Sequence, residues 1–218
     1  MKRVAVILSG CGVFDGAEIH ESVLALLALD RANAHITCAA PDIPQKRVVN
    51  HLTKQPAASE TRNVLVESAR IARGNIIPLS QLNVSEIDAI ILPGGFGAAT
   101  NLCDFALAGE KFGVNAEVAK VLQEAHKAGK PIGFVCIAPA IASKLFGPEK
   151  VEFTIGNDAD TAKALQASGA RHVNCTVHNI VVDRRLKIVS TPAYMLASRI
   201  TEAEAGINKL VQAVLEMA

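Results

Sequence analysis

The chain has 218 residues, with 22 basic and 21 acidic side chains and a net charge of +1. Its length fits one domain with a buried core, and its composition, 50% apolar and 20% charged, excludes an intrinsically disordered chain. The near-neutral charge gives no electrostatic reason to expect binding to nucleic acid or to an anionic membrane. No apolar run approaches the ~20 residues that span a bilayer.

The five cysteines are odd in number and form no C-x-x-C pair, and metal-ligand spacing is absent. A chain of this length does not need disulfides to fold, so the cysteine usage favours a cytosolic protein. The short apolar run after the N-terminal Met-Lys-Arg is shorter than the core of a signal peptide and predicts a buried first strand instead.

Along the chain, short apolar runs alternate with segments of helical periodicity. We expect strands at 3–8, 34–40, 87–92, 132–135, 151–155, 179–183 and 187–190. We expect helices at 19–32, 61–73, 114–128, 137–145, 160–168 and 194–215. The polar stretch 41–60 has no clear period and predicts an excursion from the core, such as a hairpin or cap.

Continuous apolar strands separated by amphipathic helices predict a parallel sheet covered on both faces. No linker or internal repeat divides the chain, so residues 1–218 are expected to form a single domain. In such a fold ligands bind beyond the carboxyl ends of the strands. Functional residues are therefore expected directly after the predicted strands.

The segment G-F-V-C-I-A-P-A carries Cys136 at the junction of a buried strand and a helix. This layout is that of a nucleophile elbow, and the nearby helix N-terminus would favour the thiolate. The pattern lacks the G-x-S-x-G form of hydrolases, and a small buried cysteine that merely packs in the sheet explains it equally well.

The segment L-P-G-G-F-G-A-A places Gly94 and Gly95 after another predicted strand. Glycines there let backbone N–H groups face a ligand, as in an oxyanion hole, although a plain tight turn fits as well. A third loop, S-G-C-G-V-F-D-G-A-E-I-H-E, offers Glu18, His20 and Glu21 for acid–base chemistry. For each of these side chains alone, a place in the first turn of a helix is the simpler explanation.

Taken together, these motifs resemble the DJ-1/PfpI superfamily of class I glutamine amidotransferase-like domains over nearly the whole chain. The segments V-I-L-S-G-C-G-V-F-D-G, E-I-H-E, E-T-R-N-V-L, L-P-G-G-F-G-A-A-x-N-L, G-F-V-C-I-A-P-A and T-P-A-Y-M-L-A are similar to the ElbB-type branch. That branch is named for isoprenoid biosynthesis and described as a glyoxalase. The resemblance implies a flavodoxin-like three-layer α/β sandwich with a mainly parallel central sheet, and a homodimer.

The resemblance also assigns roles. It implies that Cys136 is the nucleophile and Glu21 its acidic partner, with Glu18 as the alternative. The oxyanion would be held by the Gly94–Gly95 pair and by the backbone N–H of Ile137. Two further residues are candidates for the pocket, Cys11 and His20. Cys11 lies in the loop that follows the first strand and could also act as a resolving thiol.

The chain departs from the superfamily in its histidines. Many members carry a histidine about twenty residues after the cysteine, where this chain reads F-T-I-G-N. The downstream His-x-Glu of a working glutamine amidotransferase is also missing, which disfavours that activity.

The expected function is a glutathione-independent glyoxalase of low catalytic power. It would convert glyoxal to glycolate without metal or cofactor, and its ligand would be a small dicarbonyl. Deglycase activity would account for the same turnover. The alternative is a non-catalytic ligand-binding or redox-sensing protein linked to isoprenoid biosynthesis.

Overall fold

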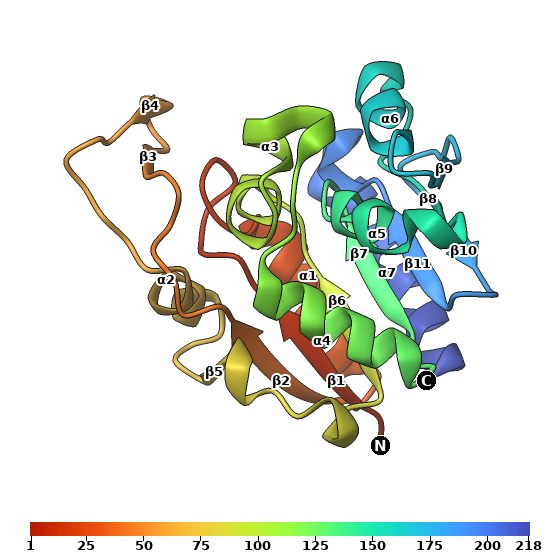
Figure 1. Ribbon diagram of the computed structural model, residues 1–218. Coiled ribbons are helices and arrows are strands. Elements are labelled where there is room, and N and C mark those ends of the chain that lie inside the picture. Colours follow the sequence, from red (N-terminus) through yellow and green to blue (C-terminus); the bar gives the residue numbers. More distant parts are fainter.

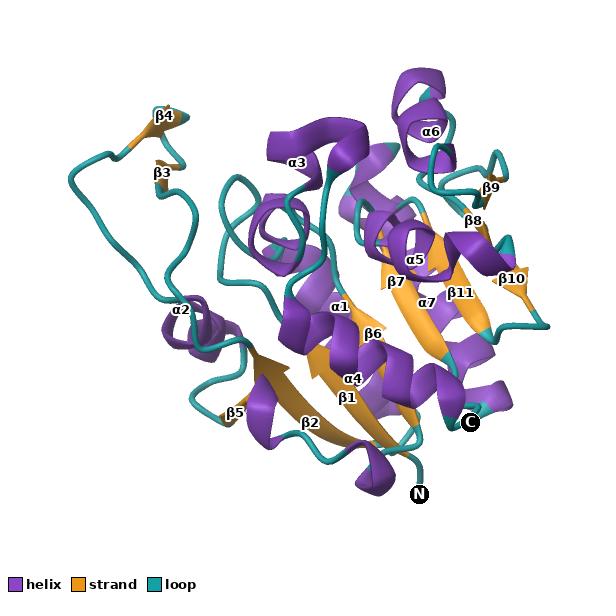
Figure 2. Ribbon diagram, in the orientation of Figure 1, coloured by secondary structure: helices purple, strands orange, loops and turns teal.

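The computed structural model describes residues 1–218 and has a seven-stranded sheet at its centre (Figures 1 and 2). The strand order is β10-β11-β7-β6-β1-β2-β5, and every pairing is parallel except that of β10 with β11. These strands are β1 (Arg3–Ile7), β2 (His35–Ala40), β5 (Ile76–Pro78), β6 (Ala89–Leu92), β7 (Ile132–Val135), β10 (Val181–Asp183) and β11 (Ile188–Thr191). The expected mainly parallel, flavodoxin-like sandwich is therefore confirmed.

Helices cover both faces of this sheet. They are α1 (Ile19–Arg31), α2 (Val64–Ile71), α3 (Phe105–Ala108), α4 (Ala116–Lys127), α5 (Pro139–Phe146), α6 (Ala159–Gln166) and α7 (Ile200–Met217). Helices α1, α2 and α7 contribute to one apolar core, and α4 and α5 to the core on the opposite face. Alternate residues of β1 belong to the two cores, Val4 and Val6 to one and Ala5 and Ile7 to the other. Burial on both faces explains why the central strands are continuous apolar runs. No helix is both long and apolar enough to cross a bilayer.

Two small two-stranded sheets lie outside the main one. β3 (Val49–Asn50) pairs antiparallel with β4 (Gln55–Pro56), so the expected excursion at 41–60 does contain a hairpin. We call residues 41–60 the arm, which reaches past α2 at one side of the molecule (Figure 1). β8 (Glu152–Phe153) pairs parallel with β9 (Arg171–His172).

The expected elements at 151–155 and 194–215 need correction. The first is only the short strand β8, outside the main sheet. The closing helix begins at Ile200, because the Glu202 carboxylate accepts hydrogen bonds from the N–H groups of Ser198 and Arg199 and fixes the helix start there. Residues 193–195 instead form a short 3-10 turn. The strands β5 and β9 were not expected, since runs of two or three residues carry too little periodicity to be recognised.

The N-terminal half of α7 packs closely on β11 through Gly206. A Cβ at this position would lie 2.4 Å from Oγ1 of Thr191 and 2.7 Å from the carbonyl oxygen of Val177. We expect Gly206→Ala to lower the free energy of unfolding by about 1–3 kcal/mol, although alanine favours helix over glycine. Urea unfolding measures it, with Gly113→Ala as the control, because nothing lies within 4 Å of that Cβ. Equal stability of the two variants would contradict this packing.

Candidate active site

Cys136 lies between β7 and α5 in a backbone conformation that is rare for a non-glycine residue. Its φ is +63°, its N–H donates to the carbonyl of Thr191 at 2.9 Å, and α5 begins three residues later, at Pro139. Such left-handed geometry stores about 1–3 kcal/mol of strain and persists only where neighbours enforce it. The strand–cysteine–helix junction is thus a nucleophile elbow in three dimensions.

Two backbone N–H groups, those of Gly95 and Ile137, act on the thiol of Cys136, and both lower its pKa. Gly95 has a φ of +89°, a conformation that glycine adopts without penalty. The N–H of Gly94 has another partner, since it donates to Oε2 of Glu21 at 3.0 Å. Of the three residues expected to form the oxyanion hole, the structure therefore brings Gly95 and Ile137 to the sulfur, whereas Gly94 binds the carboxylate.

Gly94 also allows the thiol and the carboxylate to approach each other. A Cβ on Gly94 would lie 2.4 Å from Cβ of Cys136 and 2.7 Å from Oε2 of Glu21. No side chain can occupy that space without displacing one of the two. A glycine is therefore required at position 94, because the side chains of Cys136 and Glu21 approach each other closely there.

Glu21, in the first turn of α1, is fully buried directly beside the thiol. Its two carboxylate oxygens accept hydrogen bonds from the N–H groups of Gly94 and Tyr194, at 3.0 and 3.2 Å, and the side chain lies beside that of Cys136. Glu18 caps the helix instead, because its Oε2 accepts the N–H of Glu21 at 2.7 Å. The structure thus places Glu21, and not Glu18, against the cysteine.

Burial sets the protonation of this pair. Burial, and after it the negative charge of Glu18, raises the pKa of Glu21 to about 8, although the three hydrogen bonds lower it. Burial, and then the charge of Glu21, also raises the pKa of the Cys136 thiol, against the effect of the Gly95 and Ile137 N–H groups. The helix N-terminus alone had suggested the opposite direction for the thiol. At neutral pH, Glu21 therefore keeps its proton for much of the time and can serve as an acid or a base.

The thiol opens into a mostly apolar cavity of about 330 Å³. Its walls come from five parts of the chain: the loop after β1, the segment from the end of β6 to α3, the elbow, α6, and the turn after β11. The lining residues are Val13, Glu18, Gly95, Phe96, Ala99, Phe105, Ala106, Cys136, Ile137, Thr161, Tyr194 and Met195.

The remaining pocket candidates fall at different places. His20 is exposed, and its Nδ1 lies 2.9 Å from the hydroxyl of Tyr194, which lines the cavity. Cys11 does not line it; the charged groups that act on its thiol are Glu67, Arg70, Asp15 and Arg62. Sequence reasoning placed Tyr194 at the start of the expected closing helix and not among the site residues. Its position directly after β11, at the carboxyl edge of the sheet, was the signal that could have identified it.

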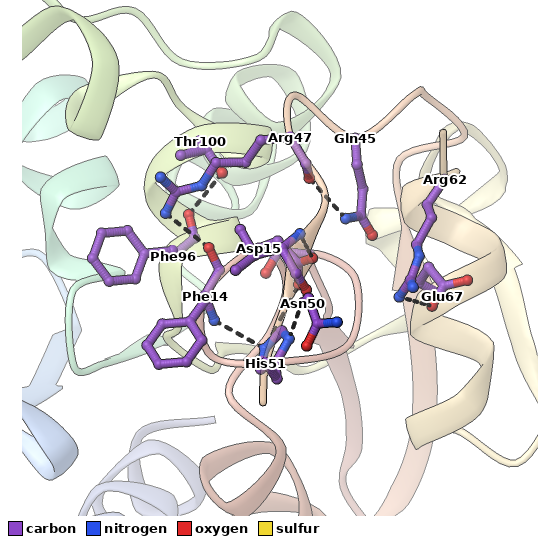
Figure 3. A network of polar contacts seen from close by, with 12 residues as sticks. Phe14, Asp15, Gln45, Arg47, Asn50, His51, Arg62, Glu67, Phe96 and Thr100 are labelled. Atoms are coloured by element: carbon purple, nitrogen blue, oxygen red, sulfur yellow. Dashed lines mark hydrogen bonds and ion pairs between the residues drawn. The ribbon is translucent and has the colours of Figure 1, made fainter. Parts of the chain in front are cut away.

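The arm contacts the loop after β1 and Phe96, as the polar network in Figure 3 shows. Nη2 of Arg47 donates to the carbonyl of Phe14 at 2.8 Å, and its guanidinium lies 4.9 Å from the centre of the Phe96 ring. Nε2 of His51 accepts the N–H of Phe14 at 3.2 Å, and Asp15 accepts the N–H of Val49 at 2.8 Å. The arm thereby holds the loop after β1 and Phe96, one of the residues that line the cavity.

No group of three or more His, Cys, Asp and Glu side chains in the chain is arranged to bind a metal ion. The elbow cysteine, its buried carboxylate and the mainly parallel sheet together define the class of protein: a class I glutamine amidotransferase-like domain with the DJ-1/PfpI type of fold.

Comparison with known proteins narrows this class. No family model matches the chain. The human "glutamine amidotransferase-like class 1 domain-containing protein 3, mitochondrial" is 47% identical over 224 residues, covering 99% of this chain and 83% of that protein. The crystal structure of an isoprenoid biosynthesis protein with amidotransferase-like domain from Ehrlichia chaffeensis is 38% identical, with a TM-score of 0.93 over 100% of this chain and 99% of that one. DJ-1beta of Drosophila melanogaster, 18% identical with a TM-score of 0.56 over 100% and 95% of the two chains, shares the fold.

The chain belongs to the family of glutamine amidotransferase-like class 1 domain proteins, and it shares the fold of DJ-1/ThiJ/PfpI proteins.

The raised pKa of Glu21 makes stability depend on pH. The ordinary pKa of this carboxyl is 4.5, and in the folded protein it is about 8. Between these values the folded chain holds a proton that the unfolded chain has lost, so the contribution of Glu21 to stability falls as pH rises. We expect the unfolding free energy of the wild type, relative to Glu21→Gln, to fall between about pH 5 and 8, by at most about 1.4 kcal/mol per unit. Urea unfolding at several pH values measures this, and parallel profiles would contradict it.

The contacts made by the arm predict that the loop after β1 becomes more mobile when Arg47 is replaced. Arg47→Met keeps an apolar stem but removes the hydrogen bond to Phe14 and the cation over Phe96. We expect amide exchange in residues 12–16 and 96 to become about tenfold faster, while global stability changes by less than about 1 kcal/mol. Hydrogen-exchange mass spectrometry measures this. Arg31→Met, which removes the ion pair with Glu204, is the control and should leave this loop unchanged.

Proposed function

We propose that the protein is a glutathione-independent glyoxalase that converts glyoxal to glycolate through Cys136. The observation that carries the proposal is the contact between the elbow thiol and the buried carboxyl of Glu21, with the N–H groups of Gly95 and Ile137 facing the same sulfur. A nucleophile, a proton carrier and two oxyanion donors meet at one end of an apolar cavity.

The chemistry follows from these positions. The Glu21 carboxylate takes the thiol proton as the sulfur of Cys136 adds to one aldehyde carbon. The resulting alkoxide is held by the N–H groups of Gly95 and Ile137 and receives this proton from Glu21, which gives the hemithioacetal. The Glu21 carboxylate then moves the C–H proton of that carbon to the neighbouring carbon, while the hydroxyl proton of the hemithioacetal passes to the neighbouring oxygen. The first carbon is thereby oxidised by two electrons and the second is reduced by two, which leaves a glycolyl thioester. Water hydrolyses the thioester, releases glycolate and restores the thiol.

The pKa of Glu21 suits this role. A group that passes one proton between two carbons must accept it and give it up at similar free energy, which a pKa of about 8 allows near neutral pH. The raised pKa of the thiol limits the fraction of thiolate, which fits the low catalytic power expected from the sequence.

A second candidate function is a ligand-binding or redox-sensing protein, linked to isoprenoid biosynthesis as the Ehrlichia relative is by name. The raised pKa of the thiol and a cavity without a histidine favour the ligand-binding form of this alternative, because both reduce nucleophilic catalysis. The raised pKa does not favour redox sensing, since oxidants attack the thiolate. Location in the cytosol and assembly as a homodimer stay predictions; the human relative carries "mitochondrial" in its name.

Turnover of glyoxal without glutathione separates the two functions. We expect many turnovers for the wild type, none above background for Cys136→Ala, and a loss of about 10²–10⁴-fold for Glu21→Gln. Glycolate is measured by chromatography, and folding of each variant by circular dichroism. Cys175→Ala is the control, because Cys175 does not line the cavity. Activity that persists in Cys136→Ala, or is absent from the wild type, would exclude the glyoxalase mechanism.

A further inference from the structure

The cavity beside Cys136 is far larger than glyoxal needs. Its volume is about 330 Å³, whereas a water molecule in the liquid takes about 30 Å³. Glyoxal has only four non-hydrogen atoms, so most of the cavity would stay unfilled around it. Cavities of about 300 Å³ and more are typical of sites that enclose larger organic ligands.

The walls also define what could fill the remaining space. Nine of the twelve lining residues are hydrophobic, among them Phe96, Phe105, Ile137 and Met195. A branched alkyl or aryl group placed there would be removed from water and stabilised in proportion to its apolar area.

The charges at the cavity wall also restrict which substrates can bind. Glu18 is the only charged side chain that lines it, and no lysine, arginine or histidine does. The guanidinium of Arg47 is bound to the carbonyl of Phe14 and to the ring of Phe96. A phosphate or carboxylate on the substrate would find no cation and would face the Glu18 carboxylate, which disfavours its binding.

We infer that the carbonyl compounds that react with Cys136 are uncharged and carry an apolar group, and that the substrate is a 2-oxoaldehyde with a branched alkyl or aryl substituent. The catalytic part of this inference rests on the proposed function. The sulfur adds to the aldehyde carbon, and the substituent on the ketone carbon lies against Phe96 and Phe105. The aldehyde carbon is oxidised by two electrons, the ketone carbon is reduced by two, and water releases a 2-hydroxy acid and the thiol.

Turnover is compared for glyoxal, 4-methyl-2-oxopentanal and the anionic hydroxypyruvaldehyde phosphate. We expect kcat/KM for the branched compound to exceed that for glyoxal by at least about tenfold, which corresponds to about 1.4 kcal/mol of apolar burial, and the phosphate to be the poorest of the three. Equal values for glyoxal and the branched compound, or a preference for the phosphate, would overturn the inference and leave the proposed function standing.

Two exposed alanines of α3 provide matched variants. Ala106 lines the cavity, whereas Ala108 does not. We expect Ala106→Leu to reduce the preference for the branched compound to within about twofold of glyoxal, because the added side chain fills the space of the substituent. Ala108→Leu should leave the preference unchanged. The same effect from both variants would contradict binding in this cavity.

Alkylation of Cys136 tests the selectivity without turnover. Mass spectrometry gives the rates for N-benzyl iodoacetamide, iodoacetamide and iodoacetate, with the partly exposed Cys11 and Cys175 as internal references outside the cavity. We expect the ratio of benzyl to unsubstituted rate at Cys136 to exceed that at Cys175 by about tenfold, and iodoacetate to be slowest at Cys136. Equal ratios overturn the inference, whatever the turnover. Selective alkylation without any turnover supports the apolar cavity and excludes the glyoxalase instead.

Discussion

The buried carboxylate of Glu21 is the interaction on which the site depends. It accepts one N–H from the segment after β6 and one from the turn after β11, and it touches the cysteine after β7. A helix residue thus joins the ends of three strands through one side chain. An unpaired carboxylate would be costly to bury at this depth, and these contacts, together with its raised pKa, make the burial tolerable.

Much of the fold followed from periodicity, because central strands buried on both faces must be apolar throughout. The position of the elbow was also accessible, since a cysteine between a buried strand and a helix lies at the carboxyl edge of the sheet. Packing alone explained this cysteine equally well from the sequence, and its place beside Glu21 became visible only in the structure. Glu18 and Glu21 could not be separated from the residues alone, because both suit the first turn of a helix. The hydrogen bonds in the structure separate them: Glu18 caps the helix, whereas Glu21 is held beside the thiol by the N–H groups of Gly94 and Tyr194.

Contacts between residues far apart in the chain could not be predicted either, because local residue preferences fit more than one arrangement. The closing helix was extended back to Tyr194, because alanine, tyrosine, methionine and leucine all favour helix or tolerate it. The hydrogen bonds of Glu202 stop it at Ile200 and leave Tyr194 free to cover the carboxylate. Similarly, the polar composition of the arm marked it as an excursion, but nothing local indicated that Arg47 would lie over Phe96.

The placement of Tyr194 has a consequence for the order in which the protein is made. The thiol and its carboxylate belong to residues 136 and 21, yet one of the two backbone groups that hold the carboxylate comes from residue 194, close to the end of the chain. During synthesis from the N-terminus, most of the sheet can assemble while this last contact is missing. Until β11 docks, Cys136 also lacks the Thr191 carbonyl that accepts its N–H. A growing chain therefore lacks both contacts, and the geometry of the site is completed only as the final quarter of the chain folds.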